Sequence, residues 1–111
     1  MYLEFESKDD KLIAYMVGEL DHHSAEEVRN KIDDRLDRDS IVKLIMDFSG
    51  VTFMDSSGIG VVIGRYKKLN LKKGSICITK ARDSVKRVFE LSGMFKIIKL
   101  YDSIDEAVEN I

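Results

Sequence analysis

The sequence feature that most constrains the fold is a junction at which a buried-strand pattern gives way to a helical pattern. Residues 42–48, Val-Lys-Leu-Ile-Met-Asp-Phe, are a nearly continuous apolar run with the length and composition of a buried strand. Further along, apolar residues recur at spacings of three and four, which predicts a helix from about residue 57 to 69; they are Ile59, Val62, Ile63, Tyr66 and Leu69. The segment Asp55-Ser56-Ser57 therefore places two hydroxyl groups where this helix should begin.

The rest of the chain alternates between strand and helix patterns. Residues 2–7 and 11–17, on either side of a polar turn, predict a β-hairpin at one edge of a sheet. The other segments are a helix from Ser24 to near Arg38, a strand at 75–79, a helix at 82–92 ending at Gly93, a strand at 96–101 and a short helix from Ser103. The order β-β-α-β-α-β-α-β-α predicts an α/β fold over residues 1–111, one domain with a mixed, mostly parallel sheet of about five strands and about four helices.

Two of these helices begin with the pattern of a capping box. In this motif a serine hydroxyl accepts from the amide three residues later, and a glutamate at that position reaches back. The two patterns are Ser24-Ala25-Glu26-Glu27 and Ser103-Ile104-Asp105-Glu106. We therefore expect the Ser24 hydroxyl to accept a hydrogen bond from the amide of Glu27.

Charge and composition narrow the class of protein. The net charge is −2, but residues 1–55 carry seven Lys or Arg against fourteen Asp or Glu, and residues 56–111 carry eleven against six. The basic residues lie on predicted helix faces and turns without an aromatic stacking pattern, which argues against nucleic-acid binding. The single cysteine, Cys77, lies in an apolar run and is expected to be buried. Without a leader pattern or an apolar segment of membrane-spanning length, we expect a cytoplasmic protein that does not bind membranes.

Two enzyme-like interpretations of the junction lack the residues they require. The glycines at 58, 60 and 64 form the pattern Gly-x-Gly-x-x-x-Gly, which has one residue more between the last two glycines than the dinucleotide-binding fingerprint Gly-x-Gly-x-x-Gly. The acidic residue that should end a following strand is also missing. A serine nucleophile elbow needs glycines two residues to either side, which neither Ser56 nor Ser57 has. We therefore expect neither a hydrolase nor a dinucleotide-binding enzyme.

The histidines offer no metal site either. His22 and His23 are adjacent in a segment that precedes a helix, and no cysteine or third ligand accompanies them. A zinc site needs three or four such ligands. The sequence therefore predicts no catalytic residue, no metal and no cofactor of its own.

The glycines of the predicted helix still need a physical reason. Each costs about 1 kcal/mol relative to alanine inside a helix. We favour a close approach of this helix to the sheet or to a partner protein, and a strained active-site turn is the other option.

Chemistry alone leaves two roles for the hydroxyls at the helix start. One is an ordinary N-cap, for which serine and aspartate are preferred. The other is to carry a phosphate, whose charge of about −1.5 to −2 a helix N-terminus tolerates through its free amides and dipole. With Asp55 alongside, a phosphorylated surface would repel an acidic or apolar partner.

Three segments spread along the chain carry a family resemblance. They read Gly18-Glu19-Leu20-Asp21-His22-His23-x-Ala25-Glu26, Phe53-Met54-Asp55-Ser56-Ser57-Gly58-x-Gly60-Val61-x-x-Gly64-Arg65-Tyr66-Lys67 and Val85-Lys86-Arg87-x-Phe89-x-x-Ser92-Gly93-x-Phe95-Lys96-Ile97-Ile98. Together they resemble the anti-sigma factor antagonists, the bacterial branch of STAS domains, and most closely the antagonists of sporulation. The one departure in the first segment is Ser24 in place of threonine, which keeps a hydroxyl.

The resemblance implies a partner-switching function rather than an enzyme. In this family the unphosphorylated antagonist binds an anti-sigma factor that is also a serine kinase, and so releases the sporulation sigma factor. The kinase, which binds the ATP, phosphorylates the serine directly after the aspartate, here Ser56, and the pair separates. A serine phosphatase reverses the modification.

The resemblance also implies a set of partner-binding residues. Asp21 and Asp55 match residues near the acceptor, and Ser57 is its neighbour. Because turns at the same end of a sheet lie close together, we expect the Asp21 turn, Ser56 and the first turns of the following helix to form one contact surface. The partner-binding candidates are Asp21, Asp55, Ser57, Gly58, Ile59 and Val62; Ile59, Val61 and Val62 belong to the core instead if they face inward.

Two alternatives within the same family stay open. One is a STAS module of a stress-response partner-switching system, which would release a different sigma factor. The other is a STAS module that binds a small anion or a nucleotide with the amides at the helix start.

Overall fold

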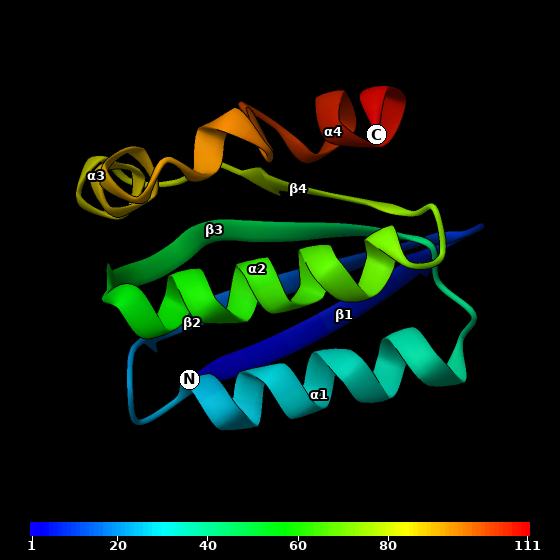
Figure 1. Cartoon of the computed structure of the whole chain (residues 1–111), viewed down its shortest axis with the longest axis horizontal. Coiled ribbons are helices and arrows are strands. Elements are labelled where there is room, and N and C mark those ends of the chain that lie inside the picture. The colour runs from blue at the N-terminus through cyan, green and yellow to red at the C-terminus, as the bar shows by residue number, and fades with distance from the viewer.

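A five-stranded sheet forms the centre of the structure, with its strands in chain order β1-β2-β3-β4-β5 (Figure 1). The computed structural model describes residues 1–111. The strands are β1 (Tyr2–Lys8), β2 (Lys11–Leu20), β3 (Lys43–Met54), β4 (Ser75–Thr79) and β5 (Lys99–Tyr101). β1 is antiparallel to β2, and the other neighbours are parallel. The predicted edge hairpin and the mixed, mostly parallel sheet are confirmed.

Four helices cover the two faces of this sheet unequally. They are α1 (Ala25–Arg38), α2 (Ser56–Asn70), α3 (Asp83–Ser92) and α4 (Ile104–Asn110). A cluster of 22 buried residues joins α1, α2 and α3 to one face, and α1 and α2 run side by side there (Figure 1). A smaller cluster of four joins α4 to the other face and includes Cys77, whose predicted burial is confirmed. The predicted order of elements is therefore correct.

Three strand boundaries differ by three or more residues from those predicted. β2 ends at Leu20 rather than at residue 17. β3 continues to Met54, well past the predicted end at residue 48, because its second half pairs with β2 alone after the pairing with β4 stops at Asp47↔Thr79. β5 begins at Lys99 rather than at residue 96, because Met94–Lys96 form a 3-10 turn, η1. Gly93 ends α3 with φ +78°, the left-handed conformation expected of a glycine at a helix C-terminus.

The C-terminal helix has the serine cap that its sequence predicts, without the return bond from Glu106 that would complete the capping box. The Ser103 hydroxyl accepts a hydrogen bond of 3.0 Å from the amide of Glu106. This short helix packs Ala107 against Ile13, Ile45 and Cys77. No helix in the structure is both long enough and apolar enough to cross a membrane.

Candidate functional site

The candidate site lies where β2 and β3 end side by side. Leu20 and Met54 are the last paired residues of the two strands, and the amide of Asp55 donates to the carbonyl oxygen of Leu20 at 3.3 Å. The turn that follows β2, residues 21–24, is therefore held next to the first turn of α2. The predicted juxtaposition of the Asp21 turn and the Ser56 segment is confirmed.

Asp55, rather than either serine, is the N-cap of α2. Its backbone is extended, with φ −110° and ψ −170°, and its Oδ1 accepts from the amide of Ser57 at 2.8 Å. Ser56 is the first residue of the helix and is exposed, whereas Ser57 is half-buried. Because the carboxylate does the capping, the cap does not use the hydroxyl of the exposed Ser56.

The second oxygen of the same carboxylate holds the neighbouring turn. Asp55 Oδ2 accepts from the backbone amide of His22 at 3.2 Å. One side chain thus links the start of α2 to a residue 33 positions earlier in the sequence. Sequence reasoning placed Asp55 near the acceptor but did not predict this bond.

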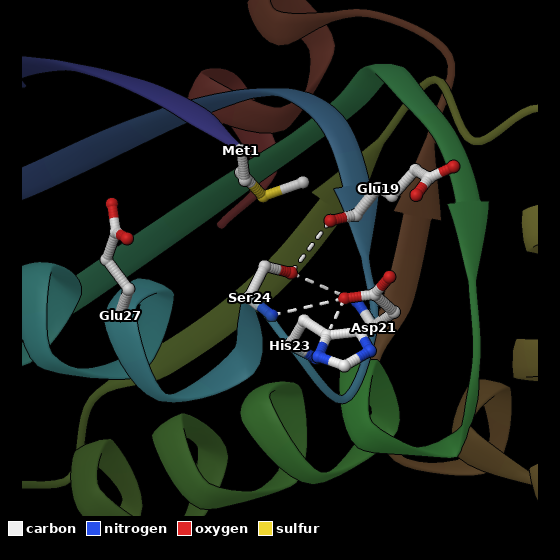
Figure 2. Close-up of a pocket in the computed structure, with 6 residues that line it drawn as sticks. All are labelled: Met1, Glu19, Asp21, His23, Ser24 and Glu27. Carbon is white, nitrogen blue, oxygen red and sulfur yellow. Dashed lines mark hydrogen bonds between the residues drawn. The ribbon is translucent and has the colours of Figure 1, made fainter.

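Asp21 organises the turn itself (Figure 2). Its Oδ1 accepts from the amides of His23 at 3.0 Å and Ser24 at 3.1 Å. Desolvation acts to raise the pKa of this carboxyl, but the hydrogen bonds from the Ser24 and His23 amides outweigh it, so the pKa lies below its ordinary value. Asp21 is thus a fixed acceptor within the turn.

The capping box predicted at Ser24 is wrong. Ser24 already has helical dihedrals, φ −100° and ψ −17°, and makes no side-chain cap, whereas a capping serine needs an extended backbone. Its hydroxyl instead donates to the carbonyl of Glu19 at 2.7 Å and accepts from the amide of Asp21 at 3.1 Å. Glu27 pairs with Lys31 at 2.8 Å rather than reaching back. Ser24 therefore closes the turn, not the helix.

An open pocket lies beside this turn, between the chain terminus and the start of α1 (Figure 2). Three carboxylate side chains contribute to its lining, which consists of Met1, Glu19, Asp21, His23, Ser24 and Glu27. No group of His, Cys, Asp or Glu side chains in the structure is arranged to hold a metal ion. The pocket makes this end of the molecule acidic.

The predicted contact residues on α2 separate into surface and core. Ile59 is half-buried at the edge of the main core and keeps some exposed surface. Val62 has no exposed surface, so the prediction that it contacts a partner is wrong and the core alternative applies. The same prediction for Gly58 is wrong, because Gly58 is buried against Met54 and Leu20. Val61 is also buried, with 4% of its surface exposed. The reason is the direction of α2, which turns this side of its first turns toward the sheet.

The three glycines of α2 have different surroundings. A Cβ on Gly58 would collide with the side chain of Met54, lying 2.6 Å from its Sδ, and would lie 3.2 Å from Leu20. At Gly60 and Gly64 a Cβ would meet nothing within 4 Å. Close approach to the sheet therefore explains Gly58 alone, and Gly60 and Gly64 are not explained by packing within the chain.

An ion pair that no local sequence pattern predicts fixes α2 against α1. Arg65 Nε lies 2.9 Å from Asp33 Oδ1, with 7% and 25% of the two side chains exposed. Desolvation lowers the pKa of Arg65, and Asp33 opposes that shift. Lys68 adds an exposed contact of 3.0 Å to Asp37. These pairs set the position of the helix that presents Ser56.

Phe53 opens the second family segment, but its place there predicts no role for its side chain. Its surface is 50% exposed, although it directly precedes the buried Met54. It pairs with Glu19 at the end of β3, three positions before Ser56 in the sequence. Strand alternation could not have identified it, because Thr52 and Phe53 are exposed in succession.

Comparison with known proteins agrees with this architecture. The STAS domain model matches residues 2–107. An anti-sigma F factor antagonist of Paenibacillus polymyxa is 37% identical over 103 residues, which cover 93% of this chain and 88% of that protein. An anti-sigma-B factor antagonist of Listeria monocytogenes is 29% identical over 99 residues, covering 88% of this chain and 86% of its own length.

Solved structures give the same result. The anti-sigma factor antagonist SpoIIAA in its unphosphorylated form superposes on this chain with a TM-score of 0.85 and is 29% identical in sequence. The superposition covers 97% of this chain and 94% of the SpoIIAA chain. The Bacillus cell fate determinant SpoIIAA in the phosphorylated form gives 0.76 at 28% identity, with 97% of both chains covered. The chain therefore belongs to the STAS domain family, in its branch of anti-sigma factor antagonists.

Proposed function

We propose that this chain binds an anti-sigma factor when Ser56 is unphosphorylated and is released when Ser56 carries a phosphate. The observation that carries the proposal is the position of Ser56, exposed at the first residue of α2 while Asp55 does the capping. A phosphate can be added there without removing the cap. The relatives named above as antagonists, and the phosphorylated form of SpoIIAA, support the same role.

The switch follows from the charge of the phosphate. In the proposed cycle the anti-sigma factor is also a serine kinase: the Ser56 hydroxyl oxygen attacks the γ-phosphorus of ATP, the bond to ADP breaks, and the hydroxyl proton passes to a base of the kinase. The product carries about −1.5 to −2 charges beside Asp55 and the acidic turn. A serine phosphatase would hydrolyse the ester with water and restore the hydroxyl.

The repulsion is large enough to act as a switch. A unit charge brought within about 4 Å of a like charge costs about 1 kcal/mol in water and about 4 kcal/mol at the dielectric typical near a protein surface. Each 1.4 kcal/mol is a tenfold change in affinity. One acidic partner group facing Ser56 would therefore weaken binding by roughly fivefold to a thousandfold.

The proposal makes this chain a regulatory protein rather than an enzyme. ATP is bound by the kinase, so the chain needs no cofactor, and we propose that the exchange with the sigma factor takes place in the cytoplasm. The sigma factor released would be that of sporulation, as the family resemblance implies. The similarity to an anti-sigma F factor antagonist supports a sigma factor of the F type. The enzyme alternative is an esterase, which would hydrolyse an ester substrate and lose this activity in Ser56→Ala. We expect the natural chain to hydrolyse no ester.

The test is phosphorylation by the cognate anti-sigma kinase with ATP and Mg²⁺, followed by intact mass and peptide mapping. We expect one phosphate, on Ser56, in the natural chain and in Ser57→Ala, and none in Ser56→Ala. Ser84→Ala is a matched control, because Asp83-Ser84 also opens a helix and Ser84 is exposed. Phosphate on Ser57, or a phosphorylated Ser56→Ala protein, would contradict the assignment. Ser56→Asp should weaken binding to the kinase, and an unchanged affinity would argue against an electrostatic switch.

A stress-response antagonist is the second candidate, favoured by the similarity to the Listeria anti-sigma-B factor antagonist. The sigma factor released from its complex when the chain is added distinguishes the two. Binding of a free anion or nucleotide is disfavoured, because Asp55 already occupies the amide of Ser57. A thermal shift with nucleotide but no kinase would reverse that conclusion.

A further inference from the structure

The carboxylate of Asp55 joins two segments that the proposed partner would contact together. Its Oδ1 accepts from the amide of Ser57 at 2.8 Å, and its Oδ2 accepts from the amide of His22 at 3.2 Å. The first bond holds the turn of α2 that carries Ser56. The second holds the turn of residues 21–24.

The other hydrogen bonds of that turn stay within it or reach only as far as β2 and α1. Asp21 Oδ1 accepts from the amides of His23 and Ser24, the Asp21 carbonyl accepts from the amide of Ala25 at 2.9 Å, and the Ser24 hydroxyl donates to Glu19. The bond from His22 to Asp55 is the one hydrogen bond between this turn and the Asp55–Ser57 segment. Losing it would remove the turn's direct link to Asp55 and leave in place the turn's own bonds and the bond from the Asp55 amide to Leu20, at the end of β2.

A phosphate on Ser56 would act on Asp55 before it acted on anything else. The two groups are adjacent in sequence, so a phosphate of about −1.5 to −2 charges lies next to the carboxylate, and its oxygens compete for the same amide donors. The shorter bond to Ser57 is reinforced by the helix N-terminus. The longer bond to His22 has no such support and is the one that yields.

We infer that Asp55 is a positioning residue that transmits the phosphorylation state of Ser56 to the turn of residues 21–24. The inference rests on the proposed function, since it takes Ser56 as the acceptor. Its consequence is that phosphorylation changes the partner surface twice. It adds charge at Ser56, and it breaks the direct link between Asp55 and the turn of residues 21–24, which loosens the turn at His22.

The test uses phosphoserine placed at position 56 during translation, so that it does not depend on the kinase. Amide hydrogen exchange and ¹⁵N–¹H spectra are compared between the modified and unmodified chains. We expect exchange of the His22 amide to become about two- to tenfold faster, the range that one hydrogen bond provides. The amides of His23 and Ser24 should hold their rates, because they bond to Asp21. Phosphoserine at 84 should leave all three unchanged.

A variant of Asp55 separates transmission from direct repulsion. Asp55→Asn has a single acceptor oxygen, and asparagine caps helices as well as aspartate. In the unmodified variant the His22 amide should already exchange fast, while the Ser57 amide stays protected, and phosphoserine at 56 should add nothing further. Where Asp55→Asn loses protection at Ser57, Asp55→Ser is used, since serine also caps and is too short to reach His22.

Two results would overturn the inference. One is a His22 amide that exchanges equally fast with and without phosphoserine at position 56 in the natural chain. The other is a His22 amide that responds to phosphoserine as strongly in the Asp55 variant as in the natural chain. Failure of the proposed function is a different result, namely no phosphate transferred to Ser56 by the kinase, and intact mass reports it independently of the exchange rates.

Discussion

Replacing Gly60 and Gly64 together with alanine should stabilise the fold and weaken partner binding. Both lie inside α2, and a Cβ at either would meet nothing within 4 Å. Each glycine costs about 0.8 to 1.0 kcal/mol relative to alanine in a helix interior, so the double variant should gain about 2 kcal/mol of unfolding free energy. With about 4 °C per kcal/mol for a domain of this size, the melting temperature should rise by about 8 °C.

Binding should change in the opposite direction. A helix that keeps two destabilising glycines on an open face, directly beyond Ser56, leaves room for close approach of another backbone. One methyl inserted into a packed contact costs about 1 to 3 kcal/mol, so the affinity for the anti-sigma factor should fall at least fivefold per alanine. Stability is measured by urea unfolding, where the dependence of the unfolding free energy on urea concentration should be the same in both proteins. Affinity is measured by calorimetry.

Gly58→Ala is the matched control. Here the new methyl would collide with Met54 and press on Leu20, so overpacking of about 1 to 3 kcal/mol should exceed the gain in helix propensity. This variant should lose stability where the other two gain it. A double variant of Gly60 and Gly64 that gains stability and binds with unaltered affinity would refute the close-approach argument.

Three further predictions concern stability and reactivity. Asp33→Ala leaves Arg65 buried without its partner and should cost about 1 to 3 kcal/mol in urea unfolding, whereas Asp37→Ala, whose side chain is 60% exposed, should cost less than 1 kcal/mol. Because the folded pKa of Asp21 lies below its unfolded value, its contribution is complete above about pH 4 and is lost as pH falls further. In Asp21→Asn the unfolding free energy should therefore fall less steeply as the pH drops below about 4. The same pH dependence in the variant and the natural chain would contradict this. Burial raises the pKa of the Cys77 thiol to about 12, so iodoacetamide should label Cys77 only in urea, and rapid labelling of the folded chain would show that the site opens.

The sequence predicted the helices and strands well because buried side chains recur at the spacing typical of each kind of element. The run at 42–48 and the spacing of Ile59, Val62 and Leu69 correspond to β3 and α2. The end of β3 was missed, because Ser49 and Gly50 interrupt the apolar run although the backbone continues to pair with β2. Periodicity reports which side chains are buried, not how far a backbone pairs.

The details of the site depended on contacts that no local pattern encodes. The Ser24 capping box failed because its pattern does not specify whether the serine is extended or already helical. The bond from His22 to Asp55 and the pair of Arg65 with Asp33 join residues that only the fold brings together. The residues of the junction left capping and phosphorylation both open, and only the family resemblance favoured the phosphate.

The structure gives a physical reason for the order aspartate then serine at this helix start. A serine at the capping position would lose its role when phosphorylated, because the same oxygen would carry the phosphate, and a lost cap costs about 0.5 to 2 kcal/mol. With Asp55 as the cap, the oxygen that would be modified and the oxygen that holds the helix belong to different residues. The charge at the surface can then change by about two units while α2 keeps its first hydrogen bond. A rapidly reversible switch needs this separation, because each phosphorylation would otherwise have to refold the start of the helix before the next partner could bind.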